Sequence, residues 1–506
     1  MADADRRPAR TRFAPSPTGL PHVGNFRNAL YSWLLALRTG GQFLFRIEDT
    51  DRERYDPAAV QALEDALSWL NLDYDEGPDI GGPYGPYVQS ERLVEYQTVA
   101  DRLLASGHAY RCFCSRERLQ AVREARQAAN VHPHGYDRHC RGLSDGEVRQ
   151  HLDAGSPFVV RFAVPLDEDV SFEDVVRGRI TYRSRELDDH VLLKSDGFPT
   201  YHLAHMADDR AMEITHVIRS EEWLPSTPRH VLQYRALGWT PPLYVHPGLI
   251  LGRDPQSGKT SKLSKRHGSV SILEYRDQGY LPDALLNFIA LLGWSPGADR
   301  EVMARSELVA LFGLEGVNSS PSVFDLDKLN WMNGVYLRQL SAGELVEQAL
   351  PFLTRAGFVS STPSDTERVY AGEVLALEQE RLKTLAEAPH AAAFFFQDPP
   401  VYDDAAVRKR LFTPSAGPAL DAAAERLNAT PRWDVESIEA AIRAAASDLG
   451  LKPAEVIHPT RVAVTGRMAG PGLFETLAAL GRQRTLARVR HARATYAVAE
   501  EKNADS

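Results

Sequence analysis

The sequence predicts an α/β protein that is built on a doubly wound parallel sheet, interrupted by an insertion and followed by a helical region. From the N-terminus, strand-like and helix-like segments alternate, which is the βαβ rhythm of a parallel sheet. The rhythm breaks near His108 and returns at Phe198; beyond Leu340 only helical periodicity stands out. The first four alternating segments are Thr11 to Ala14, Arg27 to Arg38, Gln42 to Ile47 and Pro57 to Leu70.

These changes of pattern suggest six parts. We expect a catalytic Rossmann-type domain in two halves, residues 1–107 and 198–256, separated by an α+β insertion at 108–197. A basic loop and a further domain occupy 257–340, and two helical subdomains occupy 341–398 and 399–506. Within the tail, Pro351, Pro389 and Pro399 are predicted to stop helices.

Composition favours a multi-domain cytoplasmic protein. A chain of 506 residues with 43% hydrophobic residues exceeds one ordinary core. The charged N-terminus has no apolar segment behind it, and no apolar run is long enough for a membrane span, so we expect neither secretion nor a membrane partner. Three cysteines do not suggest a disulfide scaffold. The net charge of −10 does not exclude nucleic acid, because phosphate binding responds to local charge.

The stretch Pro15 to Asn25, PSPTGLPHVGN, lies between the first predicted strand and the first predicted helix. The free amides of a helix N-terminus attract anions, and Gly19 and Gly24 allow backbone to approach a ligand closely. His22 can donate a hydrogen bond to a phosphate oxygen. A Pro/Gly-rich turn with no ligand remains an alternative.

A second stretch, Lys262 to Arg266, reads KLSKR and follows a strand-like apolar run from Tyr244 to Leu251. A basic run is often only a solvated loop. Lys262 and Lys265 are nevertheless placed to neutralise phosphates if the loop folds over the first motif.

Charged residues at predicted strand ends are candidates for substrate contacts, because open α/β sheets bind ligands at the carboxyl ends of their strands. Glu48 follows the strand FLFRI, and Arg219 ends the strand in ITHVIRSEEW. An arginine suits a carboxylate, since its planar fork makes two parallel hydrogen bonds. Arg12 is a second candidate for this role.

Taken together, HVGN (His22 to Asn25) and KLSKR resemble the HIGH and KMSKS signatures of class I aminoacyl-tRNA synthetases. Further segments are similar to bacterial glutamyl-tRNA synthetases, and the resemblance covers nearly the whole chain. These segments are RFAPSPTG, RIEDTD, YDEGP, QSER, LLKSDGFPTYHLAH, THVIRSEEWLPSTPRH and VFDLDKLNWMNGVYL.

The resemblance implies a reaction of ATP, Mg²⁺ and L-glutamate with tRNA(Glu), and leaves open whether tRNA(Gln) is also charged. His22, Lys262 and Lys265 are then the expected catalytic residues, and a monomer is expected. Tyr201 and Trp223 are equally compatible with ordinary core residues. His205 stands where some relatives are expected to carry an amide, which leaves its role open. The expected glutamate pocket is Arg12, Ser16, Glu48, Tyr201, Arg219 and Trp223, and the expected ATP contacts are Pro15, Thr18, Gly19, His22, Gly24, Asn25, Lys262, Ser264 and Lys265.

The cysteines form a possible zinc site. Cys112, Cys114 and Cys140 supply three thiolates, and some members of the family carry zinc here through Cys-x-Cys and a later Cys-x-His. This chain has Gly142 at the last position, so His139 is the candidate for the fourth ligand. Three free cysteines remain the alternative.

The helical tail separates two relatives, because the similar glutaminyl-tRNA synthetases carry a β-barrel anticodon domain. Arg381 is the candidate anticodon-reading residue, although an exposed helix arginine is the plainer interpretation. The arginines from Arg482 to Arg493 fit a tRNA contact or a solvated helix face. Two other functions stay open: a truncated relative that glutamylates a modified tRNA base, disfavoured by the helical tail, and a non-catalytic tRNA-binding protein, disfavoured by intact HVGN and KLSKR.

Overall fold

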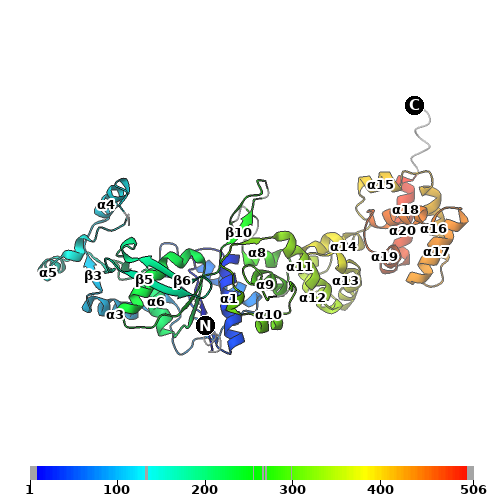
Figure 1. Ribbon diagram of the computed structural model, residues 1–506. Coiled ribbons are helices and arrows are strands. Elements are labelled where there is room, and N and C mark those ends of the chain that lie inside the picture. The colour runs from blue at the N-terminus through cyan, green and yellow to red at the C-terminus, as the bar shows by residue number, and fades with distance from the viewer. Residues whose placement is uncertain are drawn as a thin grey trace. The chain divides into compact units, whose positions relative to one another are not determined.

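The computed structural model describes residues 8–131, 135–254, 256–264, 267, 271–297 and 299–497. Two compact units make up the chain. Unit 1 comprises residues 1–276 and 282–326 and carries the sheets, and unit 2 comprises residues 277–281 and 327–506 (Figure 1). Lys265, one of the predicted catalytic residues, lies outside the described residues.

The strands all belong to unit 1 in the part of the chain that the structure describes. They are β1 (Arg10–Phe13), β2 (Gln42–Phe45), β3 (Ala109–Cys112), β4 (Val159–Phe162), β5 (Asp169–Asp174), β6 (Gly178–Arg183), β7 (Val191–Leu193), β8 (His216–Ile218), β9 (Leu243–Val245), β10 (Ile250–Arg253), β11 (Thr260–Lys262) and β12 (Ser322–Phe324).

The helices of unit 1 are α1 (Val23–Thr39), α2 (Pro57–Trp69), α3 (Leu93–Ala105), α4 (Arg116–Ala128), α5 (Asp145–Asp153), α6 (Tyr201–Ala211), α7 (Thr227–Ala236), α8 (Ile272–Asp277), α9 (Pro282–Ala290) and α10 (Arg305–Leu311). Those of unit 2 are α11 (Leu326–Gln339), α12 (Ala342–Arg355), α13 (Asp365–Glu378), α14 (Ala388–Phe396), α15 (Asp404–Arg410), α16 (Ala416–Ala429), α17 (Val435–Asp448), α18 (Pro453–Thr465), α19 (Leu473–Leu480) and α20 (Arg482–Tyr496).

The predicted parallel sheet is confirmed. Strands β5, β9 and β8 run parallel in one sheet, with β6 antiparallel at its edge, and β1 pairs in parallel with β2. The amide of Thr215 donates to the carbonyl of Arg10 over 2.9 Å, which places β1 next to β8. Buried side chains of α6 and α7, such as Leu203, Met206 and Leu232, pack in one core with Val170 of β5 and Val217 of β8.

The first βαβ unit shows why the sequence signals were readable. Helix α1 begins at His22, whose side chain caps it, and ends at Gly40, which adopts φ +65°, a conformation that glycine accepts at little cost. Asp56 caps α2 and Pro57 occupies its first turn. These are local signals, and the predicted boundaries agree with the observed ones to within a few residues.

The region between residues 108 and 197 contains two different pieces. Strands β3, β4 and β7 form an antiparallel sheet of their own, flanked by α4 and α5, which bury none of their residues fully. Strands β5 and β6 instead extend the sheet of β8 and β9. The sheet of β8 and β9 therefore receives two of its four strands from this region.

Unit 2 is helical throughout its described residues, as predicted. Its larger core is formed by α16, α17, α18 and α20, which bury residues such as Leu420, Ile442 and Val489. The prediction that Pro351 stops a helix is wrong, because it lies inside α12. Burial of Leu345, Leu350 and Leu353 on one face of α12 outweighs the hydrogen bond that the proline cannot donate.

Candidate active site

A cavity of about 1260 Å³ opens at the carboxyl ends of β1, β2 and β8. All six predicted glutamate-pocket residues line it, and so do three of the predicted ATP contacts. These nine residues are Arg12, Ser16, Glu48, Tyr201, Arg219 and Trp223, together with Pro15, Thr18 and Asn25. The sequence prediction thus selected residues that the fold brings to one cavity.

His22 caps α1 with its own side chain. Its Nδ1 accepts the amide of Gly24 at 3.0 Å, so the proton of the neutral ring lies on Nε2. Burial, and then the charge of Lys262, lower the pKa of His22. The amides of Asn25 and Phe26 donate to the carbonyl of His22. We expected the first amides of the helix to be unpaired and available to an anion. This is wrong for the amides of Gly24, Asn25 and Phe26, because each donates to His22.

Arg219 is a buried cation whose contacts are all neutral. Its terminal nitrogens lie 3.0 Å from the Tyr201 hydroxyl, 3.1 Å from Nε2 of His205 and 3.0 Å from Oγ1 of Thr227. Only 6% of the residue is exposed, and no carboxylate among the described residues forms an ion pair with it. A buried charge without a counter-charge is costly, which favours an anionic ligand at this wall of the cavity.

Arg12, the second predicted carboxylate clamp, has a different environment. Its Nε donates to Asp209 over 3.1 Å, so the protein already balances its charge. Asp209 also pairs with Arg46 at 2.9 Å, and Arg46 pairs with Glu48 at 2.9 Å. Burial raises the pKa of Glu48 despite the neighbouring guanidinium. Of the two arginines, Arg219 is the one that lacks an anionic partner.

His205 stacks on Tyr201, with ring centroids 5.1 Å apart and an interplanar angle of 14°. It lies between Arg219, 3.1 Å from Nε2, and Arg12, 3.4 Å from Nδ1. A neutral imidazole accepts only one hydrogen bond, and Nδ1 also lies 3.2 Å from Asp209, so we assign the proton to Nδ1 and the acceptor to Nε2. Burial and the charge of Arg219 hold the pKa of His205 well below its usual value.

Sequence reasoning missed several residues that complete this site. Arg46 and Asp209 balance its charges, and Thr227 and His246 contact Arg219. The sequence did carry a signal for Asp209. It lies four residues, or one helical turn, after His205, so the two side chains share one face of α6. For His246, the sequence offers no local signal.

Comparison with known proteins agrees with this geometry. Residues 8–331 match the catalytic domain of class I tRNA synthetases of the E and Q type, and residues 344–493 match an anticodon-binding domain. The glutamate–tRNA ligase of Dehalococcoides mccartyi strain BAV1 is 48% identical over 95% of this chain and 96% of its own length. That of Roseiflexus castenholzii is 44% identical over 97% of both. The chain belongs to the glutamate–tRNA ligases, a family of class I aminoacyl-tRNA synthetases.

A solved structure supports the same relationship. The glutamate tRNA ligase from Elizabethkingia meningosepticum, in complex with its amino acid, superposes with a TM-score of 0.88 at 34% identity, covering 97% of the synthetase described here and 100% of the other chain. The glutamate-tRNA synthetase from Elizabethkingia anophelis gives a TM-score of 0.85 at 34% identity.

The basic loop of the synthetase begins beside the cavity. Lys262 ends β11 and forms an exposed ion pair with Glu222, 2.6 Å away. Glu222 itself lines the cavity, so this lysine stands at its rim. The amide of Ser264 donates to Nδ1 of His267 at 3.1 Å. Gly19, His22, Gly24, Lys262 and Ser264 are not among the residues that line the cavity.

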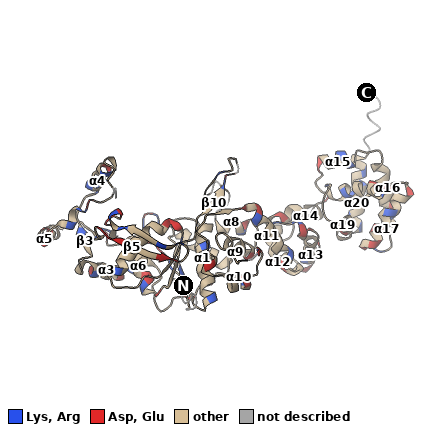
Figure 2. Ribbon diagram, in the orientation of Figure 1, with Lys and Arg blue, Asp and Glu red and all other residues tan. Residues whose placement is uncertain are grey.

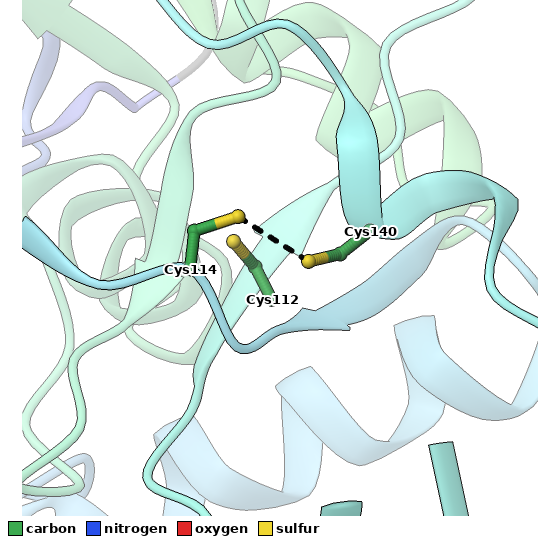
Figure 3. Close-up of side chains that lie close together, drawn as sticks. All are labelled: Cys112, Cys114 and Cys140. Atoms are coloured by element: carbon green, nitrogen blue, oxygen red, sulfur yellow. Dashed lines mark hydrogen bonds between the residues drawn. The ribbon is translucent and has the colours of Figure 1, made fainter. Parts of the chain in front are cut away.

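The three cysteines of the synthetase lie together (Figure 3). Their sulfur atoms are all within 4.8 Å of one another, and those of Cys114 and Cys140 are 3.4 Å apart. The prediction that His139 joins them is wrong: among the described residues the group contains the cysteines alone. His139 and Cys140 are successive residues of a 3-10 turn, whose side chains point about 120° apart.

The hydroxyl of Tyr136 lies close to the thiols. It lies 3.3 Å from the sulfur of Cys112 and 3.7 Å from that of Cys114, and it accepts the amide of Cys140 at 2.8 Å. Three thiols and one phenol oxygen therefore converge on one point. Such a set is rich enough in sulfur to suit zinc.

Most of the arginine-rich α20 serves the fold of unit 2. Arg484 and Arg488 pair with Asp398, Arg493 pairs with Asp421, and Arg482 donates to the carbonyl of Thr430. Figure 2 shows both basic and acidic positions on the helices of this unit. These contacts give the four arginines a role in holding unit 2 together, and Arg488 is buried rather than solvated.

Arg381 lies in a short 3-10 turn after α13, half exposed. Its guanidinium donates to the carbonyl of Leu377 at 3.1 Å and lies 3.9 Å from Glu378.

In the part of the synthetase that the structure describes, we find no helix that is long and apolar enough to cross a bilayer.

Proposed function

We propose that the protein ligates L-glutamate to the 3′ end of tRNA(Glu) in two steps. The α-carboxylate of glutamate attacks the α-phosphorus of ATP, the bond to pyrophosphate breaks, and glutamyl-adenylate forms. A ribose hydroxyl of the terminal adenosine then attacks the acyl carbon, and AMP leaves. Neither step needs a nucleophile from the protein; both need alignment and neutralisation of charge.

Arg219 carries this proposal, because a buried guanidinium with neutral contacts only is a receptor for the side-chain carboxylate of glutamate. Glu48, buried beyond the carboxyl end of β2, receives the α-ammonium group, and Tyr201 and Trp223 form an aromatic wall, their ring centroids 4.3 Å apart. Arg12 and Ser16 complete the pocket. Glutamine lacks the charge that Arg219 requires.

For ATP, the proposal uses the proton on Nε2 of His22 and the charge of Lys262, with Lys265 joining from the same loop. Mg²⁺ arrives with the phosphates as part of the nucleotide substrate. Pro15, Thr18 and Asn25 line the cavity near the start of α1, which suits them to the rest of the nucleotide. The ion pair with Glu222 must open before Lys262 can reach a phosphate.

Aminoacylation with ATP and radiolabelled amino acid tests the proposal. We expect glutamate and not glutamine to be attached to tRNA(Glu), and a parallel assay with tRNA(Gln) decides whether that tRNA is also a substrate. Arg219→Leu should lower kcat/KM for glutamate by about 100-fold or more, since two charge-assisted hydrogen bonds are lost. Its KM for ATP should stay near the wild-type value. Efficient charging of glutamine by the wild-type protein would refute the role of Arg219.

We also propose that Cys112, Cys114 and Cys140 hold a zinc ion, with the Tyr136 hydroxyl nearest to the fourth position. The ion would tie β3 to the turn after residue 135. Metal analysis of the purified protein tests this. We expect one zinc per chain, lost in Cys140→Ser, weakened in Tyr136→Phe and retained in His139→Ala. Loss in His139→Ala with retention in Tyr136→Phe would reverse the assignment.

Arg381 remains our candidate for a contact with the anticodon, on the grounds of its exposed position in unit 2. The six-part division of the chain, a monomeric state and a cytoplasmic location belong to the same proposal. Gel filtration with light scattering tests the monomer.

A further inference from the structure

A chain of three buried side chains ends at Arg219. Its Nε donates to Nε2 of His246 at 3.0 Å, and Nδ1 of His246 lies 2.6 Å from Oδ2 of Asp174. The exposed fractions are 6% for Arg219, 0% for His246 and 2% for Asp174. No role was predicted for His246 or Asp174 from the sequence.

Strand register brings the three residues together. Strands β8 and β9 are parallel, with Ile218 opposite Val245, so the residues that follow, Arg219 and His246, emerge side by side. The amide of Arg219 donates to the carbonyl of Val245 at 3.1 Å, which locks this position. Strand β5 lies on the other side of β9, and Asp174 is its last residue. Three neighbouring strand ends thus supply one line of side chains.

The hydrogen bonds fix where each proton lies. Asp174 accepts the amides of Val176 and Arg177 on Oδ1, both at 3.0 Å, which leaves Oδ2 for His246. An ionised carboxylate only accepts, so Nδ1 of His246 carries the proton and Nε2 offers a lone pair. Burial lowers the pKa of His246 to about 4, so the ring is neutral near pH 7. The other tautomer would set a donor against the Nε–H of Arg219.

We propose that Asp174 and His246 are positioning residues that fix the guanidinium plane of Arg219 for the side-chain carboxylate of the amino-acid substrate. This inference rests on the proposed role of Arg219 in binding glutamate. Holding Nε from behind leaves the two terminal nitrogens, which contact only neutral groups, to meet the carboxylate. A fork fixed in advance loses less entropy on binding than a freely rotating one.

Kinetics of Asp174→Asn test the proposal. The oxygen of the asparagine amide can still accept the two backbone amides. Its NH₂ group, however, is a donor and cannot accept the hydrogen bond from Nδ1 of His246. We expect the KM for glutamate to rise about tenfold or more, as for an unsatisfied buried donor, while the KM for ATP and the melting temperature stay near wild type.

A second pair of variants guards against misfolding of the first. His246→Gln can return an acceptor near the position of Nε2, whereas His246→Leu cannot. We expect the KM for glutamate to increase from wild type to His246→Gln to His246→Leu. His216→Gln is the matched control, because His216, in β8, is also buried but contacts Thr215 instead of Arg219. It should leave the KM for glutamate unchanged.

The outcomes separate this inference from the proposed function. If Arg219→Leu leaves the KM for glutamate unchanged, the role of Arg219 itself fails. If Arg219→Leu raises it and Asp174→Asn does not, only the positioning role is overturned. Equal KM values in His246→Gln and His246→Leu also overturn it, as does a parallel rise in the KM for ATP in Asp174→Asn.

Discussion

His216 offers a test of how burial sets the pH dependence of stability. It is the first residue of β8, it is 4% exposed, and burial lowers its pKa to about 4. In the unfolded chain the same ring titrates near the ordinary histidine pKa of about 6.5. The replacement His216→Gln keeps a polar side chain of similar length and removes the titration.

The sign follows from proton uptake. As pH falls through about 6.5, the unfolded chain binds a proton that the folded His216 does not bind until about pH 4, so the folded state loses stability over this window. Integrating between pH 7 and pH 5 gives a loss of about 2 kcal/mol for this one residue.

Urea unfolding at pH 7 and pH 5, followed by tryptophan fluorescence, measures the effect. Trp33, Trp69, Trp223, Trp239 and Trp294 all lie in unit 1, which also contains His216. Burial lowers the pKa values of His202 and His246 to about 4 as well, but these residues titrate equally in both proteins and cancel in the comparison. The wild type should lose about 2 kcal/mol more than His216→Gln. Equal losses in the two proteins would refute the reasoning.

Three further predictions concern other parts of the molecule. Lys262→Ala and Lys265→Ala should each slow ATP–pyrophosphate exchange, measured with tRNA present, far more than they weaken tRNA binding; equal effects would contradict a role in activation. Gly466→Ala should destabilise unit 2 by about 1–3 kcal/mol, read from its thermal transition, because φ is +73° and a Cβ would lie 2.0 Å from the carbonyl oxygen of Val401; an unchanged transition would show that the backbone adapts. Burial raises the pKa of Glu378 to about 7, so its contribution to the stability of unit 2 is present below about pH 4.5 and is lost as pH rises through 7. Glu378→Gln should therefore make the stability of unit 2 depend less on pH between about 4.5 and 7. An unchanged pH dependence in this variant would contradict the role of Glu378.

The sequence by itself determined the features that depend on near neighbours. The βαβ rhythm, the glycine after α1 and the helical character of unit 2 are all encoded within a few residues of chain. The strand-end rule then selected Glu48 and Arg219, because the carboxyl ends of parallel strands meet at one edge. Such signals survive without knowledge of the tertiary structure, since their physical cause is local.

The tertiary structure decided which groups face one another. Arg12 and Arg219 look alike in sequence, but only the fold gives Arg12 an aspartate and Arg219 a set of neutral acceptors. Tyr136 rather than His139 approaches the thiols, because His139 and Cys140 are successive residues of a 3-10 turn and their side chains point in different directions. Asp174 reaches His246 across 72 residues through strand register alone. Contacts of this kind depend on long-range packing, which no nearby residue pattern encodes.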